Sequence, residues 1–194
     1  MSETSGPCPL MGGVKIPASY PKQADPTTCG IATLAVLAAR ANADPVYLSL
    51  PPDKRERAQI HLHRVASRVG VPWPQALGTS PWALAKLASK ATGERHRIVM
   101  RGKRFRVAVD SALCRGRDVL VFTGGWDMPG SAWIPRHVVL VLADGTDTRI
   151  YAVFEPSSGK VFRVNADDFY AGAPSARASM GHWKNVLCAV VPTE

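Results

Sequence analysis

Apolar residues follow different patterns in the two halves of the chain. In the first half they lie in Ala- and Leu-rich segments without internal proline, such as residues 29–41, which is typical of buried helices. From about residue 95 onward they gather in short β-branched runs, such as residues 118–122 and 137–142, which is typical of strands. Helices followed by antiparallel strands predict an α+β fold.

Three helices are expected in the first half, over residues 28–42, 53–69 and 81–92. Each follows a polar residue that can cap its first turn. These capping residues are Thr27 or Thr28 for the first helix, Asp53 for the second and Thr79 or Ser80 for the third. Gly70 and Gly93 then stop the second and third helices, because glycine readily adopts the left-handed conformation that ends a helix.

The second half is expected to consist mainly of strands. They are predicted over residues 95–100, 105–109, 118–122, 137–142, 149–155, 161–164 and 185–191. A helical turn over residues 110–115 and a short helix over residues 167–170 lie between them. Asp144-Gly145 is a typical hairpin turn, so the strands on either side of it should pair antiparallel.

The composition is that of a globular protein. Of the 194 residues, 46% are hydrophobic and 20% are charged, which is enough apolar material for a compact core. Residues 1–22 are rich in Gly and Pro and are expected to form an arm or loop, followed by a single domain over residues 23–194. Because we find neither a membrane-spanning run nor a signal peptide, we expect a cytoplasmic protein, with export by a non-classical route left open.

The cysteines and histidines do not form a metal-binding pattern. The four cysteines are scattered, so we expect reduced thiols and neither a metal nor another cofactor. His61 and His63 are two residues apart in a predicted helix and therefore lie on different faces. We interpret both as surface or packing residues.

Basic residues exceed acidic ones, 24 to 15, which gives a net charge of +9. Much of the excess lies between Arg95 and Arg106, a cluster that could hold an acidic partner. Binding of nucleic acid is disfavoured, because no recognition helix, RNA-binding motif or zinc finger accompanies the cluster.

Cys29 is expected at the start of the first helix. Free backbone N–H groups and the helix dipole favour a thiolate there, and the thiolate is the nucleophilic form of cysteine. Gln23 lies a short loop upstream, so its side-chain amide can share the same anion-binding space. An isolated cysteine is more often a core residue. A role as nucleophile requires a histidine with an orienting partner elsewhere in the chain.

The predicted hairpin supplies such a pair. His137 begins its first strand and Glu155 ends its second, so antiparallel pairing sets them side by side. A carboxylate beside an imidazole fixes its tautomer and stabilises its protonated form. If this end of the sheet meets the first helix, Cys29, His137 and Glu155 form a site suited to nucleophilic catalysis.

Taken together, these segments resemble the bacteriocin-processing (double-glycine leader) peptidases, a branch of the papain-like cysteine peptidases. The matching segments are Gln23-x5-Cys29-Gly30-x-Ala32, Gly78-Thr79-Ser80-Pro81, Pro135-Arg136-His137-Val138-Val139, Phe154-Glu155-Pro156-Ser157-Ser158-Gly159 and Asp168-Phe169. Their order and spacing match over nearly the whole chain. The resemblance implies a papain-like fold, in which N-terminal helices, with the catalytic cysteine at a helix N-terminus, pack on a C-terminal antiparallel sheet.

The resemblance also implies roles for four residues. Cys29 would be the nucleophile, His137 the general base, Glu155 the residue that orients the imidazole, and Gln23 part of the oxyanion hole. The family usually has Asp where this chain has Glu155, which leaves Asp144 or Asp147 as the alternative third residue. The membrane and ATPase segments of the transporter-fused relatives are missing, so we expect a stand-alone member whose substrate need not be a leader peptide.

Three functions compete at this point. The leading one is a thiol-dependent hydrolase that cleaves a peptide, protein or small amide substrate through a thioester on Cys29. The same site could transfer the acyl group to an amine, as an acyltransferase or transglutaminase-like enzyme does. The third is a catalytically idle binding module with a basic face. Cys8, Cys114 and Cys188 are not expected to react, and Trp73, Trp82, Trp126 and Trp133 could line a cleft or fill the core.

Overall fold

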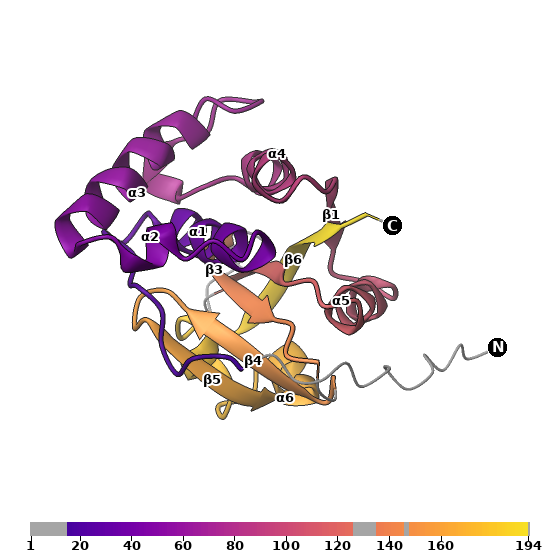
Figure 1. The fold of residues 1–194 in the computed structure, drawn as a ribbon. Helices are drawn as coiled ribbons and strands as arrows, with labels where there is room; N and C mark the ends of the chain where they lie inside the picture. The colour runs from indigo at the N-terminus through magenta and orange to yellow at the C-terminus, as the bar shows by residue number, and fades with distance from the viewer. Residues whose placement is uncertain (1–14, 126–134, 146–147, 194) are drawn as a thin grey trace.

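The computed structural model of the protein describes residues 15–125, 135–145 and 148–193 (Figure 1). Its centre is an antiparallel sheet with the strand order β1-β6-β2-β3-β4-β5. The strands are β1 (His96–Met100), β2 (Val119–Gly124), β3 (Pro135–Leu142), β4 (Ile150–Glu155), β5 (Lys160–Asn165) and β6 (Asn185–Pro192). The helices are α1 (Cys29–Ala41), α2 (Val46–Ser49), α3 (Pro52–Ala66), α4 (Pro81–Thr92), α5 (Phe105–Cys114) and α6 (Ala166–Ala171), with 3-10 turns η1 (Gln75–Leu77) and η3 (Arg177–Met180). The expected α+β class is confirmed.

Helices cover both faces of the sheet (Figure 1). Successive side chains of a strand point to opposite faces. In β2, Leu120 and Phe122 pack with residues of α1 and α4, whereas Val119 and Val121 pack with residues of α5 and α6. The central strands are therefore apolar on both sides, and the two cores together fix α1 against one face of the sheet.

Helix α4 begins and ends at the residues that were predicted. The Ser80 hydroxyl accepts a hydrogen bond from the Ala83 N–H at 3.2 Å, and Pro81 occupies the first turn, where its missing N–H costs nothing. Gly93 ends the helix with a φ of 75°. Local chemistry alone determined the ends of this element.

Helices α1 and α3 form where they were expected, but their first turns differ from the prediction. Thr28 does stand at the cap position of α1, yet its hydroxyl bonds to the backbone of Asp25 instead of to the helix. Asp53 does not cap α3, because Pro51 precedes the helix and Asp53 already lies in its first turn. Helix α3 also ends at Ala66, three residues before the predicted end.

The prediction of a strand over residues 105–109 is wrong, because this segment opens helix α5. The alternation of apolar and polar residues in it suggested a strand. The residues that α5 buries are Phe105, Val109, Ala112 and Leu113, which are spaced as on one face of a helix. Val107, which fits the strand pattern, is 56% exposed.

The predicted hairpin is confirmed, since β3 and β4 pair antiparallel with Leu140 opposite Phe154. The last strand, β6, lies between β1 and β2 instead of at an edge of the sheet. The described end of the predicted arm is attached to β5, because the Val161 N–H donates to the Ala18 carbonyl at 2.9 Å. Helix α2 and the two 3-10 turns were not predicted, and most of the expected loop over residues 124–135 lies outside the described residues.

Candidate active site

Cys29 is the first residue of α1, and its side chain is only 3% exposed. The loop before it is closed by short-range hydrogen bonds: the Asp25 carboxylate accepts from the Thr27 N–H at 2.7 Å, and the Thr28 hydroxyl donates to the Asp25 carbonyl at 3.0 Å. Because Cys29 lies in the first turn, its own N–H has no partner within the helix. The loop therefore holds the thiol and a free N–H together at the positive end of a helix dipole.

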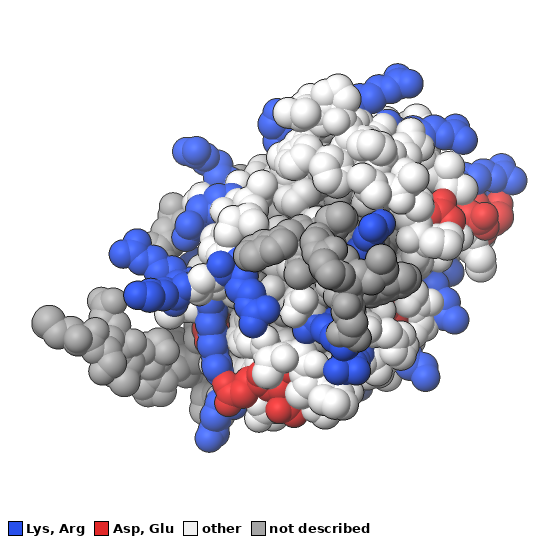
Figure 2. Space-filling model, turned by 180° about the vertical axis from the view of Figure 1, so that it is seen from behind, with Lys and Arg blue, Asp and Glu red and all other residues white. Residues whose placement is uncertain are grey.

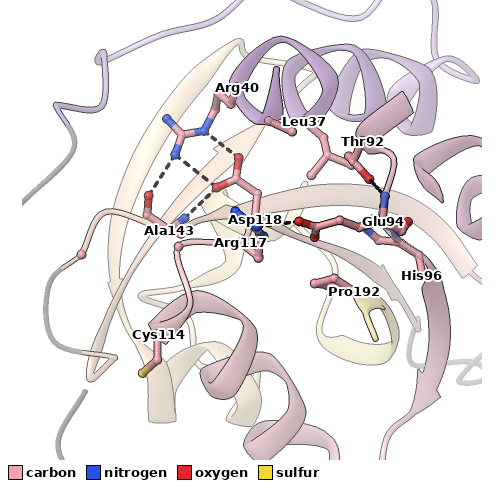
Figure 3. Close-up of a pocket in the computed structure, with 13 residues that line it drawn as sticks. Leu37, Arg40, Thr92, Glu94, His96, Cys114, Arg117, Asp118, Ala143 and Pro192 are labelled. Atoms are coloured by element: carbon pink, nitrogen blue, oxygen red, sulfur yellow. Dashed lines mark hydrogen bonds and ion pairs between the residues drawn. The ribbon is translucent and has the colours of Figure 1, made fainter. Parts of the chain in front are cut away.

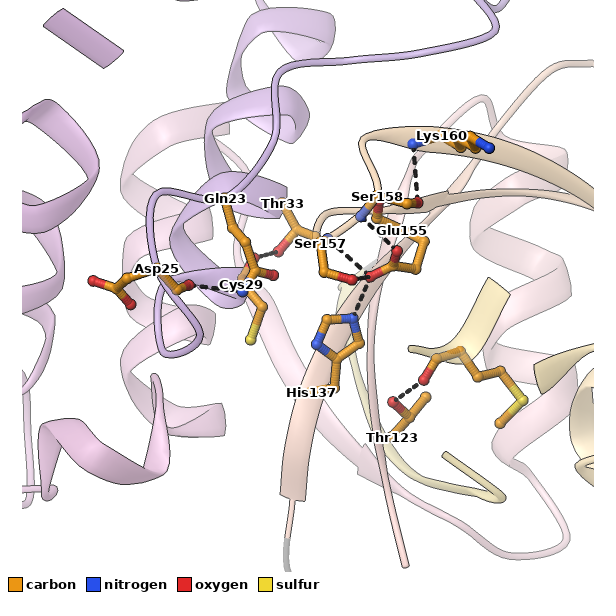
Figure 4. A network of polar contacts seen from close by, with 11 residues as sticks. Gln23, Asp25, Cys29, Thr33, Thr123, His137, Glu155, Ser157, Ser158 and Lys160 are labelled. Atoms are coloured by element: carbon orange, nitrogen blue, oxygen red, sulfur yellow. Dashed lines mark hydrogen bonds and ion pairs between the residues drawn. The ribbon is translucent and has the colours of Figure 1, made fainter. Parts of the chain in front are cut away.

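Gln23 lies beside Cys29 (Figure 4). One hydrogen of its side-chain amide is donated to the Asp25 carbonyl at 2.7 Å, which leaves the second for another acceptor. Its backbone N–H donates to the carbonyl of Pro156, the residue after Glu155, at 2.9 Å. Gln23 thus links the loop before α1 to the turn after β4.

Gln59 of α3 holds the Gln23 loop from both sides, a contact that the sequence did not predict. Its amide oxygen accepts from the Ala24 N–H at 2.8 Å, and its amide nitrogen donates to the Lys22 carbonyl at 3.0 Å. The same nitrogen donates to the Tyr47 hydroxyl at 2.7 Å, and the Gln59 side chain is almost fully buried. The sequence shows only an amide residue within a charged helix, and that Gln59 is buried becomes visible only in the fold.

His137 and Glu155 meet as the hairpin predicted. The His137 Nε2 and Glu155 Oε1 atoms are 2.8 Å apart, and both side chains are buried. The turn after β4 fixes the carboxylate, because Glu155 also accepts from the backbone N–H groups of Ser157 and Ser158 at 2.9 and 2.8 Å. The Ser157 hydroxyl donates to it as well, at 2.6 Å. The carboxylate is therefore held in place before any proton moves.

These contacts set the charges of the pair. Burial alone would lower the pKa of His137, but hydrogen bonds with Cys29 and Glu155 outweigh it and raise the pKa to about 9. Burial alone would raise the pKa of Glu155, but its bonds to His137, Ser157 and Ser158 hold the pKa well below its usual range. Because the folded pKa of His137 is raised, its contribution to stability is full below pH ~6.5 and is lost as the pH rises through about 9.

Cys29 and His137 face each other in the structure. The Cys29 thiol lies within hydrogen-bonding reach of the His137 ring. Since Nε2 bonds Glu155, the nitrogen that points toward the sulfur is Nδ1 (Figure 4). The structure therefore brings all four sequence-predicted residues, Gln23, Cys29, His137 and Glu155, to one place, from α1, its preceding loop and the β3–β4 hairpin.

Gly181 supports the His137 ring, although nothing in the sequence marked it. It follows η3 with a φ of 65°, and a Cβ at this position would lie 2.4 Å from His137 Cδ2. The Thr123 hydroxyl, opposite His137 on β2, fixes the preceding turn by donating to the Met180 carbonyl at 3.1 Å. A glycine is needed here both for its backbone conformation and for the space that the imidazole fills.

A small cavity, of about 10 Å³, lies beside Cys29 and His137. Its other lining residues are mostly apolar and come from the η1 segment and from β2 and β3: Trp73, Leu77, Gly78, Thr79, Phe122, Pro135, Arg136 and Val138. Among the described tryptophans, Trp73 lines this cavity, with Trp82 packed edge-to-face against it at a ring-centroid distance of 5.0 Å. Trp126 and Trp133 lie outside the described residues.

The other candidate residues have separate places. The Asp144 carboxylate pairs with Arg163, so it is Glu155 that stands against His137, and Asp147 lies outside the described residues. His63 is buried with its Nδ1 3.4 Å from the Thr27 hydroxyl, whereas His61 is exposed, which fits packing and surface roles. Within the described residues, no cluster of three or more His, Cys, Asp or Glu could hold a metal ion.

The cysteines differ from one another. Cys29 and Cys188 are free, and burial raises the pKa of Cys188 to about 12. Cys114 is disulfide-bonded, so the expectation that all four thiols are reduced is wrong for Cys114. Pairing depends on proximity in the fold, which the scattered positions did not reveal. Since disulfides are rare in reducing compartments, the cysteines no longer support a cytoplasmic location.

A second cavity, of about 440 Å³, lies at the opposite end of β3 (Figure 3). Its charged groups are paired with one another: Arg40 with Asp118 at 2.6 Å, and Arg117 with Glu94 at 2.5 Å. Arg40 also donates to the Ala143 carbonyl at 2.9 Å. These pairs stabilise the fold, and each of the four charged groups named is already bound to a partner.

The basic residues do not form one continuous patch on the face seen from behind (Figure 2). Within the Arg95–Arg106 cluster, Arg106 pairs with Asp110 and Asp167, and Arg101 donates to the Tyr170 carbonyl at 3.2 Å. Part of the cluster thus has a structural role, and an acidic partner stays a prediction. No helix in the described part of the chain has the length and apolar character needed to cross a membrane.

Replacing Gly181 with Ala tests the support of His137. The added Cβ would overlap the imidazole, so the ring must shift away from Cys29, and alkylation of Cys29 by iodoacetamide should slow at least several-fold. Gly93→Ala is the matched control, because Gly93 has a similar φ of 75° but nothing within 4 Å of an added Cβ. Equal rates in the two variants would show that Gly181 does not position His137.

Comparison with known proteins supports the fold. No protein-family model matches the sequence, and no curated protein matches it either. A crystal structure from Bacillus anthracis, described as that of a "putative C39-like peptidase", superposes with a TM-score of 0.52 at 14% sequence identity. The match covers 91% of this chain and 95% of that one. The protein therefore has the papain-like fold of a C39-like peptidase.

Proposed function

We propose that this protein is a cysteine peptidase or amidase that cleaves its substrate through a thioester on Cys29. The observation that carries the proposal is the joint placement of a cysteine at a helix N-terminus and a buried His137–Glu155 pair beside it. Each group alone has an ordinary structural explanation. Here His137 faces the thiol, and Glu155 fixes the tautomer of the ring from the other side. This arrangement activates a nucleophile.

The mechanism follows from the positions of these groups. The Cys29 sulfur, having lost its proton to His137 Nδ1, attacks the carbonyl carbon of the scissile amide. The oxyanion that forms is met by the Cys29 backbone N–H and the second amide hydrogen of Gln23. The C–N bond then breaks, and the amine leaves with the proton from His137. Water then attacks the thioester and gives one proton to His137, and the C–S bond breaks to release the acid and the Cys29 thiolate, which the protonated His137 ring stabilises or reprotonates.

The first test is whether the purified protein cleaves peptides at all. A mixed library of N-acetylated peptides is incubated with the protein, and new termini are identified by mass spectrometry. We expect products from the wild type and none from Cys29→Ala. If the protein is shown to be folded with a free Cys29 thiol and the peptides still stay intact with both proteins, the proposal is contradicted.

Glu155→Gln tests the third residue of the site. The amide occupies the same space but cannot stabilise an imidazolium, so turnover should fall about 10²- to 10⁴-fold while the fold is kept. The pKa of His137, followed by NMR of its ring, should drop from about 9 because one of the bonds that raise it is weakened. The alkaline limb of the pH–rate profile should move to lower pH with it.

Glu94→Gln is the control for this variant, because Glu94 pairs with Arg117 away from Cys29. It should leave both turnover and the His137 titration unchanged. Unchanged turnover in Glu155→Gln would remove Glu155 from the mechanism, whatever its effect on stability.

Gln23→Ala separates a catalyst from a binding module. A donor aimed at an oxyanion matters only when charge develops there, so turnover should fall by about a hundredfold, or ~3 kcal/mol. Alkylation of Cys29 should stay fast, because the thiol and His137 are untouched. Gln75→Ala, which removes an exposed amide on η1, is the control. Undiminished turnover in Gln23→Ala would show that Gln23 does not stabilise the oxyanion.

A further inference from the structure

Helix α3 buries polar side chains where a surface helix normally buries an apolar stripe. Its buried residues are Gln59, His63 and Ala66, whose spacings of four and three place them on one face of the helix. Both polar side chains contact the loop that precedes α1: Gln59 bonds its backbone, and His63 Nδ1 lies 3.4 Å from the Thr27 hydroxyl. Buried polar groups are costly unless they are hydrogen-bonded, so this face of α3 is suited to holding that loop.

The side-chain amide of Gln59 binds both peptide units that flank Gln23. Its nitrogen donates to the Lys22 carbonyl, in the unit before Gln23, and its oxygen accepts from the Ala24 N–H, in the unit after it. The amide cannot turn over, because its nitrogen also donates to the Tyr47 hydroxyl, and a turned amide would set two donors against each other at Ala24. Since peptide units are planar, holding both of them fixes the two backbone dihedral angles of Gln23, and with them the direction of its side chain.

We propose that Gln59 is a positioning residue for the oxyanion donor: by fixing both peptide units around Gln23, it aims the Gln23 amide at the place beside Cys29 where negative charge develops. This inference rests on the proposed function. A donor stabilises an oxyanion only when it is aimed before the reaction begins, because a small misplacement forfeits much of its effect. Gln59 is 2% exposed and lies behind the loop, so it acts through Gln23 and not on the substrate.

Hydrogen exchange tests the hold on the loop without a substrate. Gln59→Met keeps an unbranched side chain of similar length but removes the bonds, so the Ala24 amide should exchange about tenfold faster or more, as followed by NMR. The Ala32 amide, which donates to the Thr28 carbonyl at 2.9 Å within α1, is the internal control and should not change. Equal acceleration at both amides would overturn the inference, because Gln59 would then only stabilise the fold. Gln59→Asn, whose amide is one methylene shorter, is the second variant if Gln59→Met does not fold, and it should give the same pattern.

A double-mutant cycle tests whether Gln59 acts through Gln23. In Gln59→Met, kcat on a peptide cleaved by the wild type should fall about tenfold with KM little changed, because Gln23 is present but no longer aimed. In the Gln23→Ala background, the same substitution should change kcat less than about twofold, because there is no donor left to position. Alkylation of Cys29 by iodoacetamide should stay as fast as in the wild type. His61→Leu, an exposed position on the same helix, is the control and should leave kcat and alkylation unchanged.

The outcomes separate this inference from the proposed function. If the losses from Gln59→Met and Gln23→Ala multiply in the double variant, or if Gln59→Met keeps the wild-type kcat, the inference is overturned and the proposed function stands. Slower alkylation of Cys29 in Gln59→Met would also overturn it, because the substitution would then act on the thiol itself. A wild-type protein that cleaves no peptide and whose Cys29 is unreactive would overturn both.

Discussion

The hydrogen bond between His137 and Glu155 is the contact on which the rest of the site depends. It places a carboxylate and an imidazole in the protein interior, where either charge alone would be strongly disfavoured. Serine donors of the following turn hold the carboxylate, and Gly181 leaves room for the ring. Burial and charge then favour one arrangement, in which the imidazole keeps its second nitrogen toward Cys29.

The sheet order explains why distant segments converge on this contact. The β3–β4 hairpin sets the pair, α1 lies across one face with its N-terminus at the same end, and η3 reaches His137 from the other face. Gln23 joins two of these parts through its bond to Pro156. Gln59, on helix α3, holds the Gln23 loop through two hydrogen bonds to its backbone. The site is therefore supported by contacts from every layer of the fold.

The features that the sequence predicted well are those that local chemistry determines. The caps of α4 and the turn of the β3–β4 hairpin depend on residues next to them, and the hairpin alone places Glu155 beside His137. Helix α5 was missed because its apolar residues fit both a strand and one face of a helix, and only packing against the sheet chose between them. The insertion of β6, the disulfide at Cys114 and the contact of Gly181 with His137 depend on long-range pairing, which no local pattern encodes.

Residue-resolved alkylation tests the central claim, that the site makes Cys29 a nucleophile. The folded protein is treated briefly with iodoacetamide near neutral pH, and the label on each cysteine is measured by mass spectrometry. We expect Cys29 to be labelled first and faster than a free thiol, and Cys188 to stay unlabelled because burial raises its pKa to about 12. His137→Ala should slow the reaction at Cys29. Preferential labelling of Cys188, or a Cys29 rate no faster than that of a free thiol, would contradict the account.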